Sequence, residues 1–358
     1  MKNTLPWALF GLVLMTSGTV FAQRNIALDD QSVVYDQRGV QTSYEWMAPA
    51  EGQAACCENG CDVGCDQGCR GHRFGRMFER SCNAGCQDCP NRGLQVFAGF
   101  DSFRGVADTN WQDNFGVVSG LNFGTPVIGL SDFGIGWQIG GSYGLYDLTG
   151  RGTGARDTST QQQVFLTTGL FRKADADERL SFGLVYDWMV NDAYGEDAEN
   201  ATFGQWRGQV EFEMNDCTGI GLAGTYRDRN DVVLGSVYRS VNQANVFIHR
   251  KFQQGADGRL WIGVPTEDRL GFNERPGDWI LGGSIEVPLS QTLALYANFD
   301  YMKPPHNAGA LASEEVTYDI GFGLVWYPGR NACTKALNGS CWTPYMPVAN
   351  NGSFMTTW

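Results

Sequence analysis

The chain has 358 residues, with 47 glycines, 13% aromatic residues and only 18% charged residues. This composition is typical of β-barrels and β-sandwiches and argues against a helical protein. The formal net charge of −13 provides no attraction for nucleic acid, so we set that class of partner aside.

The first 22 residues predict an export signal. Lys2 supplies a positive start, Leu5–Met15 is an apolar core, and Val20–Ala22 forms a small-residue cleavage site before Gln23. The apolar core is too short to span a bilayer, and no later segment has eighteen consecutive apolar residues. The sequence therefore predicts export without a transmembrane helix.

Residues 23–92 form a separate extension that is polar at first and then dense in cysteine. Several of its cysteines directly follow a glycine, and three of these Gly-Cys pairs recur every four residues. The eight cysteines of this extension are Cys56, Cys57, Cys61, Cys65, Cys69, Cys82, Cys86 and Cys89.

From Gly93 to Tyr327 the apolar residues recur at every second position, which predicts β-strands with one apolar and one polar face. Most of these segments have ten to twelve residues, the length of a tilted membrane strand, whereas strands of soluble proteins average five or six. The twelve predicted strands are 94–103, 114–124, 133–146, 162–171, 179–190, 203–213, 219–228, 242–252, 258–265, 278–288, 291–302 and 315–327.

Short and long connections alternate along this series. They are short after each even-numbered strand and longer and more polar after each odd-numbered strand. Short turns at one rim and long loops at the other are typical of outer-membrane barrels. We therefore predict an all-β fold, an antiparallel up-and-down barrel of about twelve strands at 93–327, followed by a tail at 328–358.

The polar faces of two strands carry most of the candidate lumen residues. Arg207, Glu211 and Glu213 lie on one face of 203–213, and His249 and Lys251 lie on one face of 242–252. If these charges pair, they plug the barrel; if they are hydrated, they line a narrow pore. The sequence leaves both interpretations open.

Alternation alone also fits a soluble barrel with an apolar core, and two details favour the membrane. Glycine is frequent on the polar face, where it makes room in a narrow lumen. Aromatic residues also gather near strand ends, as in an interfacial belt. The aromatic residues assigned to this belt are Phe103, Tyr143, Phe171, Tyr186, Trp188, Phe252, Trp279, Tyr301, Trp326 and Tyr327.

With these features, residues 93–327 resemble the outer-membrane β-barrel superfamily. The last strand, Val316–Tyr327, resembles the terminal strand of that class, being apolar at alternate positions and ending on an aromatic residue. The resemblance implies outer-membrane lipid as the surroundings. A cysteine-rich leader before such a barrel also resembles uncharacterised secreted proteins of planctomycete-type bacteria. The departure is the tail, because 31 residues follow Tyr327.

Eleven cysteines in an exported chain predict disulfides, and their odd number leaves a thiol free or paired with another envelope protein. Besides the eight of the extension, Cys217 lies in a short turn and Cys333 and Cys341 in the tail. In an even-stranded barrel all eleven fall on the periplasmic side. The spacing Cys82-x3-Cys86-x2-Cys89 superficially resembles a metal site but lacks paired C-x2-C units, so we predict no metal.

Two motifs resemble catalytic or cofactor sites. Gly140–Gly144 matches G-x-S-x-G around Ser142, but it lies inside a predicted strand instead of a strand-to-helix turn. Gly219–Gly224 matches G-x-G-x-x-G but begins a strand, so it predicts no dinucleotide site. We therefore expect no enzyme activity and no cofactor.

Three functions follow, in order of preference. The first is an outer-membrane barrel that acts as a small-solute pore or as a structural envelope protein cross-linked through cysteines. The second is a soluble secreted or surface-layer β-protein that assembles through disulfides. The third is a barrel-embedded hydrolase using Ser142 and His249.

Overall fold

The structure is a computed structural model. It describes residues 93–105, 113–148, 160–174, 178–194, 200–215, 217–233, 236–252, 255–266, 276–304, 316–328, 332 and 342–357. The predicted export signal and cysteine-rich extension lie outside the described residues and remain predictions.

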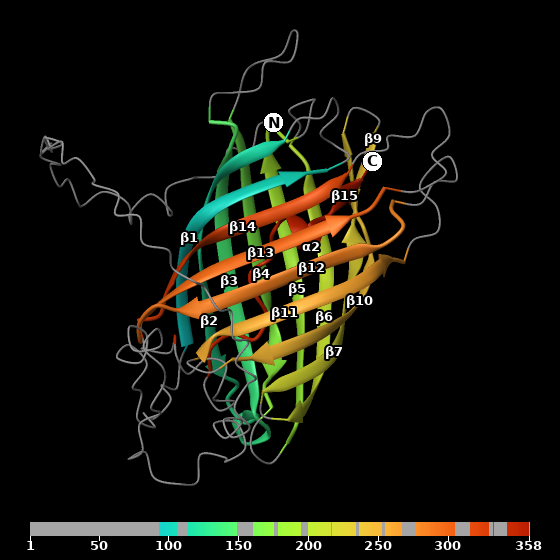
Figure 1. The fold of residues 1–358 in the computed structure, drawn as a ribbon. Coiled ribbons are helices and arrows are strands. Elements are labelled where there is room, and N and C mark those ends of the chain that lie inside the picture. Colours follow the sequence, from blue (N-terminus) through green and yellow to red (C-terminus); the bar gives the residue numbers. More distant parts are fainter. Residues whose placement is uncertain are drawn as a thin grey trace, which may run out of the picture. The chain divides into compact units, whose positions relative to one another are not determined.

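Twelve antiparallel strands close into a barrel, which confirms the predicted fold class (Figure 1). Every predicted strand is present, and each of its ends lies within two residues of the expected position. The barrel strands are β1 (Gly93–Arg104), β2 (Asn114–Pro126), β3 (Ile135–Tyr146), β4 (Gln161–Arg172), β5 (Leu180–Asp192), β6 (Thr202–Asn215), β7 (Thr218–Arg229), β10 (Gln243–Lys251), β11 (Asp257–Pro265), β12 (Ile280–Pro288), β13 (Leu293–Met302) and β14 (Thr317–Trp326).

Neighbours in the barrel are also neighbours in sequence, and β1 closes the ring by pairing with β14 from Val96↔Trp326 to Arg104↔Tyr318. The connections that follow β2, β4, β6, β10 and β12 are short and define the short-turn rim. The opposite end, with the longer connections, is the long-loop rim. The β2–β3 turn contains the 3-10 helix η1 (Ser131–Phe133), which ends at Gly134 with φ 69°.

A second, small sheet lies at the long-loop rim. The connection from β7 to β10 forms a hairpin of β8 (Asp231–Val233) and β9 (Ser236–Ser240). The last strand of the chain, β15 (Thr356–Thr357), pairs with β9 through Thr356↔Ser240 and Thr357↔Arg239. Just before β15 lies the short helix α2 (Asn351–Phe354), so the end of the tail reaches the long-loop rim.

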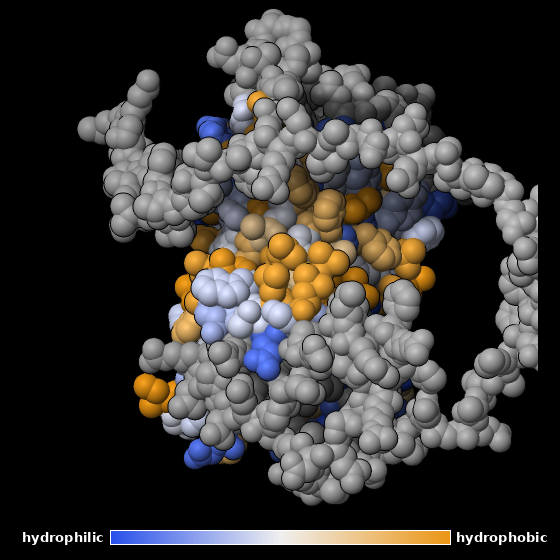
Figure 2. Space-filling view, turned by 60° about the vertical axis from the view of Figure 1, so that its left-hand side comes forward, coloured by the Kyte–Doolittle hydropathy of each residue, from blue (hydrophilic) through white to orange (hydrophobic). Residues whose placement is uncertain are grey.

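The outward face of the barrel is apolar. Leu222 is 63% exposed, Ile262 60% and Ile320 52%, and each is flanked along its strand by residues that point inward. Figure 2 shows a band of hydrophobic residues across one face of the barrel. A closed barrel with such a band buries it in hydrocarbon, so this surface is that of a membrane-spanning barrel.

Among the described residues, no helix is both long and apolar enough to cross a membrane.

The prediction of an interfacial aromatic belt was wrong in part. Phe103, Phe171 and Tyr327 are at most 3% exposed, and they point into the barrel or close its end. Trp326 and Phe252, by contrast, are exposed on the outside. An alternating pattern shows which side chains point inward only while the strand stays regular. At a strand end, where the chain enters its turn, the alternation no longer fixes the direction of a side chain.

We predict that Leu222→Arg, near the middle of β7, weakens the folded barrel by about 2–4 kcal/mol because the guanidinium would face hydrocarbon. Urea titration of the protein folded into lipid vesicles measures this loss. Ala223→Ser, which changes the adjacent inward residue, is the matched control and is expected to change the unfolding free energy by less than about 1 kcal/mol. Equal losses in both variants would contradict the assignment of faces.

Candidate functional site in the barrel lumen

The C-terminal tail, residues 342–357, runs through the lumen from the short-turn rim to the long-loop rim. At one end, the Trp342 carbonyl lies against Gly124 at the end of β2. At the other end, Thr356 pairs with Ser240. Figure 1 shows α2, near the long-loop end of this path, inside the ring of strands. The role of the tail, which the sequence leaves open, is therefore to fill the barrel.

Part of the lumen is an apolar core built around the tail. Phe354 is fully buried and its ring lies 6.0 Å from that of Phe165 on β4. Val348 and Ala349 of the tail belong to the same cluster. Each large side chain buried in this way contributes about 1.5–3 kcal/mol of transfer free energy. The wall residues of the cluster are Phe103, Tyr146, Phe165, Met189, Tyr194, Ala201, Phe203 and Tyr238.

The peptide groups of the tail bond to polar side chains of the wall. Gln138 of β3 donates to the Met346 carbonyl at 2.9 Å and accepts from the Met346 amide at 3.0 Å. Arg207 donates to the Pro347 carbonyl at 2.7 Å, and the Ala349 amide donates to Thr167 at 3.0 Å. These bonds satisfy the N–H and C=O groups of a backbone that pairs with no strand here, and such groups would otherwise be costly to bury.

Glycines on the lumen face give the tail its space. A Cβ atom at Gly140 of β3 would lie 2.6 Å from Val348 Cγ2, and one at Gly124 would overlap the Trp342 carbonyl oxygen. At these positions a side chain would displace the tail, whereas other glycines of this face, such as Gly136 and Gly144, make room for side chains of the wall.

Three buried aspartates surround α2. Asp101 Oδ2 accepts from Tyr146 at 2.7 Å and from Asn351 at 3.3 Å. Asp319 Oδ2 accepts from Asn350 of the tail at 2.6 Å. Asp300 Oδ1 accepts from the Trp261 indole at 3.0 Å. In the part of the chain that the structure describes, none of the three aspartates forms a salt bridge.

Four of the five candidate lumen residues lie together near the short-turn rim. His249 Nδ1 lies 2.5 Å from Glu211 Oε1, and its Nε2 lies 3.0 Å from Asp257 Oδ2. Lys251 pairs with Glu213 at 2.5 Å in the same region. Both ring nitrogens of His249 therefore face carboxylates.

The fifth, Arg207, lies farther along β6 and binds Asp187 through two bonds, at 2.8 and 3.1 Å. Three wall partners in these networks were not identified from the sequence, namely Asp187 on β5 and Asp257 and Arg259 on β11. Arg259 donates to Glu211 at 3.3 Å. Each occupies the polar position of an alternating segment, and that pattern was the available signal. Phe247, which breaks the alternation of β10, points inward and lies 5.4 Å from the Arg259 guanidinium.

Tyr345 connects the tail to this charged network. Its hydroxyl donates to Glu211 Oε2 at 3.0 Å, and its ring lies 5.3 Å from the Arg259 guanidinium. The Tyr345 hydroxyl therefore ties the tail to the wall at the short-turn end.

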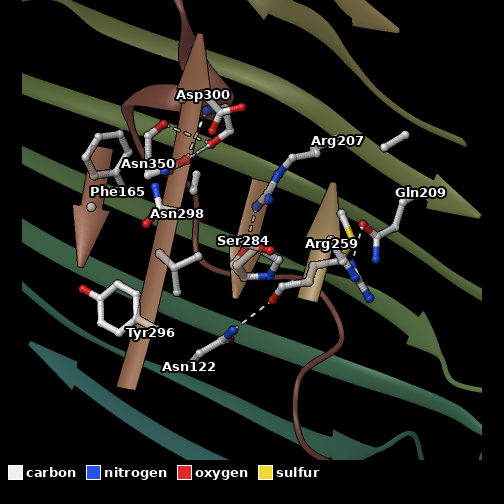
Figure 3. Close-up of a pocket in the computed structure, with 18 of the residues that line it drawn as sticks. Asn122, Phe165, Arg207, Gln209, Arg259, Ser284, Tyr296, Asn298, Asp300 and Asn350 are labelled. Atoms are coloured by element: carbon white, nitrogen blue, oxygen red, sulfur yellow. Dashed lines mark hydrogen bonds between the residues drawn. The ribbon is translucent and has the colours of Figure 1, made fainter. Parts of the chain in front are cut away.

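The tail does not fill the whole lumen. A cavity of about 350 Å³ remains beside it, lined by residues of every barrel strand except β5 and by the tail itself. In Figure 3, Tyr296, Asn298 and Asp300 follow one strand at one side of this cavity, and Arg207 and Arg259 lie at the other side.

The other sequence motifs lie inside strands. Ser142 is 7% exposed on a continuous β3, and Gly219–Gly224 belongs to β7. Cys217, the single cysteine among the described residues, is buried in the β6–β7 turn at the short-turn rim. The other ten cysteines lie outside the described residues, so the predicted disulfides remain predictions.

Comparison with known families places the barrel and its tail in one unit. The model of a "Family of unknown function (DUF6666)" matches residues 93–356, which includes the strands and the segment inside them. The chain belongs to this family. No curated protein matches the chain.

Several solved structures are similar to this family member. The Salmonella typhi outer membrane phospholipase dimer with bound calcium is 10% identical, with 65% of this chain and 90% of that chain covered and a TM-score of 0.37. An outer membrane channel from Pseudomonas putida F1 is 11% identical, with 66% and 94% covered and a TM-score of 0.42. The KdgM porin is 6% identical, with 65% and 98% covered and a TM-score of 0.37.

We predict that Asn351→Leu destabilises the folded protein by about 1–3 kcal/mol, because it leaves buried acceptors unpaired. Asn351 donates to Gln163 Oε1 at 3.0 Å as well as to Asp101. Chemical unfolding in vesicles measures the loss. Gln162→Leu, which removes an exposed partner of Tyr143, is the matched control. It is expected to lower the free energy of unfolding by less than about 1 kcal/mol. A loss no greater than that of the control would show that the tail is not held at α2.

Proposed function

We propose that this protein is a structural outer-membrane barrel, closed by its own C-terminal tail, that holds the cysteine-rich extension at the periplasmic rim. The observation that carries the proposal is the passage of residues 342–357 through the lumen. An open porin needs a continuous aqueous lumen, and here an apolar core and a series of hydrogen bonds occupy that space.

The charges of the lumen support a closed barrel. The tail from 342 to 357 carries no charged residue, and several charges of the wall bind one another. Arg207 pairs with Asp187, and Lys251 with Glu213, which is the arrangement expected of a stiffened interior. A hydrated pore would use such charges to select solutes instead.

The position of the cysteines supports an anchoring role. Cys217 lies at the short-turn rim, which in outer-membrane barrels faces the periplasm. Gly93, where the extension joins the barrel, lies at the same rim. An odd number of cysteines on one side supplies a thiol for a bond to another envelope protein.

We predict that the full-length protein shows no steady conductance in planar lipid bilayers. A variant that ends at residue 341 is expected to give steady ionic currents, because it lacks the segment that fills the lumen. Heat-modifiable migration on a detergent gel checks that the truncated barrel is folded. Full-length currents equal to those of the truncated variant would contradict the proposal.

A second measurement does not depend on folding of the truncated chain. An epitope tag placed after Trp358 is expected to be accessible to antibody on intact cells, because the tail ends at the long-loop rim. A tag inserted before Gly93 is the control and should become accessible only after the outer membrane is opened. The reverse pattern would rule out the proposed path of the tail.

We predict that the protein migrates as cross-linked species on non-reducing gels of whole envelopes and as a monomer after reduction. Blocking free thiols during lysis separates bonds present in the cell from bonds formed later. The matched control is a variant in which all eleven cysteines are serine, which should migrate as a monomer throughout. A monomer in the unreduced wild-type sample would exclude the anchoring role but not the closed barrel.

A further inference from the structure

We infer that the cavity beside the tail binds a small neutral molecule rich in hydroxyl groups, such as a monosaccharide, which enters from the short-turn rim. This inference rests on the proposed function, since it assumes a closed barrel in which the tail stays in place. The cavity volume of about 350 Å³ lies at the lower end of the range of about 300–1,000 Å³ that is typical of small-molecule sites.

Aromatic rings and amide groups line one side of the cavity. Trp261 of β11 and Tyr296 and Asn298 of β13 point inward and are not fully buried, so they keep a surface that faces the cavity. The Trp261 indole is held by a hydrogen bond of 3.0 Å to Asp300, and the Tyr296 ring packs edge-to-face on Phe97 at 6.3 Å. Both rings therefore have fixed positions before any ligand binds.

This combination of groups suits a ligand with several hydroxyls. An amide side chain offers two N–H donors and a carbonyl acceptor, and Asn298 donates to Asp319 through its nitrogen, which leaves its carbonyl oxygen able to accept. A hydroxyl group both donates and accepts, so it matches either end of an amide. The C–H groups of a sugar ring pack on aromatic rings, which supply large contact area at little entropic cost.

The ionisable groups of the described lining are already engaged with the wall, so the ligand is neutral. Each guanidinium binds a carboxylate outside the lining, and each carboxyl group of the lining is hydrogen-bonded to a wall residue. A charged ligand would bring an unpaired ion into a confined, poorly solvated space, which is costly. The pairs are Arg207 with Asp187, Arg259 with Glu211, Asp257 with His249, Glu286 with Tyr327, Asp101 with Tyr146 and Asp300 with Trp261.

A second, smaller hollow of about 60 Å³ gives a way in at the short-turn rim. The residues that line both hollows are Asp257, Arg259, Pro344 and Tyr345. The side chains of Lys251 and Asp257 are 14% and 20% exposed, so the small hollow reaches water at the rim. The Tyr345 ring and the Arg259 guanidinium, 5.3 Å apart, lie where the two hollows meet. Rotation of these two side chains joins the hollows while the backbone of the tail stays in place.

The site opens to one side only, because apolar clusters close the rest of both rims. At the long-loop rim the cluster consists of Val241, Ile280, Met302 and Met355. At the short-turn rim it consists of Ala294, Val325, Tyr327 and Ala332. A ligand therefore enters and leaves by the same route, and the cavity is a binding site instead of a pathway across the membrane.

The test is isothermal titration calorimetry of the purified full-length protein in detergent micelles, with D-glucose as the probe. We expect saturable binding of one glucose per barrel, and binding of D-glucuronate and D-glucosamine at least about tenfold weaker, because each adds one charge to a molecule of similar size.

Ser284→Phe fills the cavity from β12 and is expected to weaken glucose binding at least about tenfold. Leu281→Phe is the matched control, since it enlarges an outward side chain of the same strand and should leave the affinity unchanged. Heat-modifiable migration on a detergent gel checks that both variants are folded, and Ser284→Leu replaces Ser284→Phe if the larger ring prevents folding.

A folded barrel that binds no glucose, or that binds it equally well in the filled variant and the control, would overturn the site. Equal affinity for glucose and its charged analogues would overturn the assignment of a neutral ligand. Neither result touches the closed barrel, which is refuted instead by large wild-type currents in planar bilayers, so the two failures are distinguishable.

Discussion

A closed ring of twelve β-strands encloses more space than its inward side chains fill, and the rest of this structure follows from that constraint. Close packing of a protein interior does not tolerate a large dry void. Here the void is occupied by residues 342–357, which bring Val348 and Phe354 into contact with the wall. Some glycines of the lumen face, such as Gly140, leave the space that the tail occupies.

In the lumen, the charged side chains belong to the wall, whereas the segment that fills the space is uncharged. Wall charges bind other wall charges, as in Arg207 with Asp187 and His249 with Glu211 and Asp257. The uncharged tail contributes peptide groups, amides and apolar side chains. Because an unpaired ion in a low-dielectric interior is costly, a neutral filling segment needs no compensating charge. Two of the aspartates around α2, Asp319 and Asp101, also accept hydrogen bonds from the tail, through Asn350 and Asn351.

The tail runs from one rim of the barrel to the other. The tail leaves β14 at the short-turn rim and ends beside β9 at the long-loop rim, so the polypeptide passes through its own barrel. The charged network of Glu211 and His249 lies at the first rim, and an apolar cluster of Val241, Ile280, Met302 and Met355 lies at the second. Apolar side chains also close the short-turn rim, where Tyr327 is fully buried beside Ala294 and Val325.

The sequence by itself determined the twelve strands and their outward face, because a period of two and a length of about ten residues record membrane burial on one side. The same alternation predicted the residues of the polar face, among them Arg207, Glu211, Glu213, His249 and Lys251. Tertiary structure decided what that face meets. The segment after Tyr327 has no periodic pattern, and its fit against Gly124, Gln138 and Asp101 depends on contacts more than two hundred residues away. Only the closed ring brings those partners together, so no local signal could show that the lumen is filled.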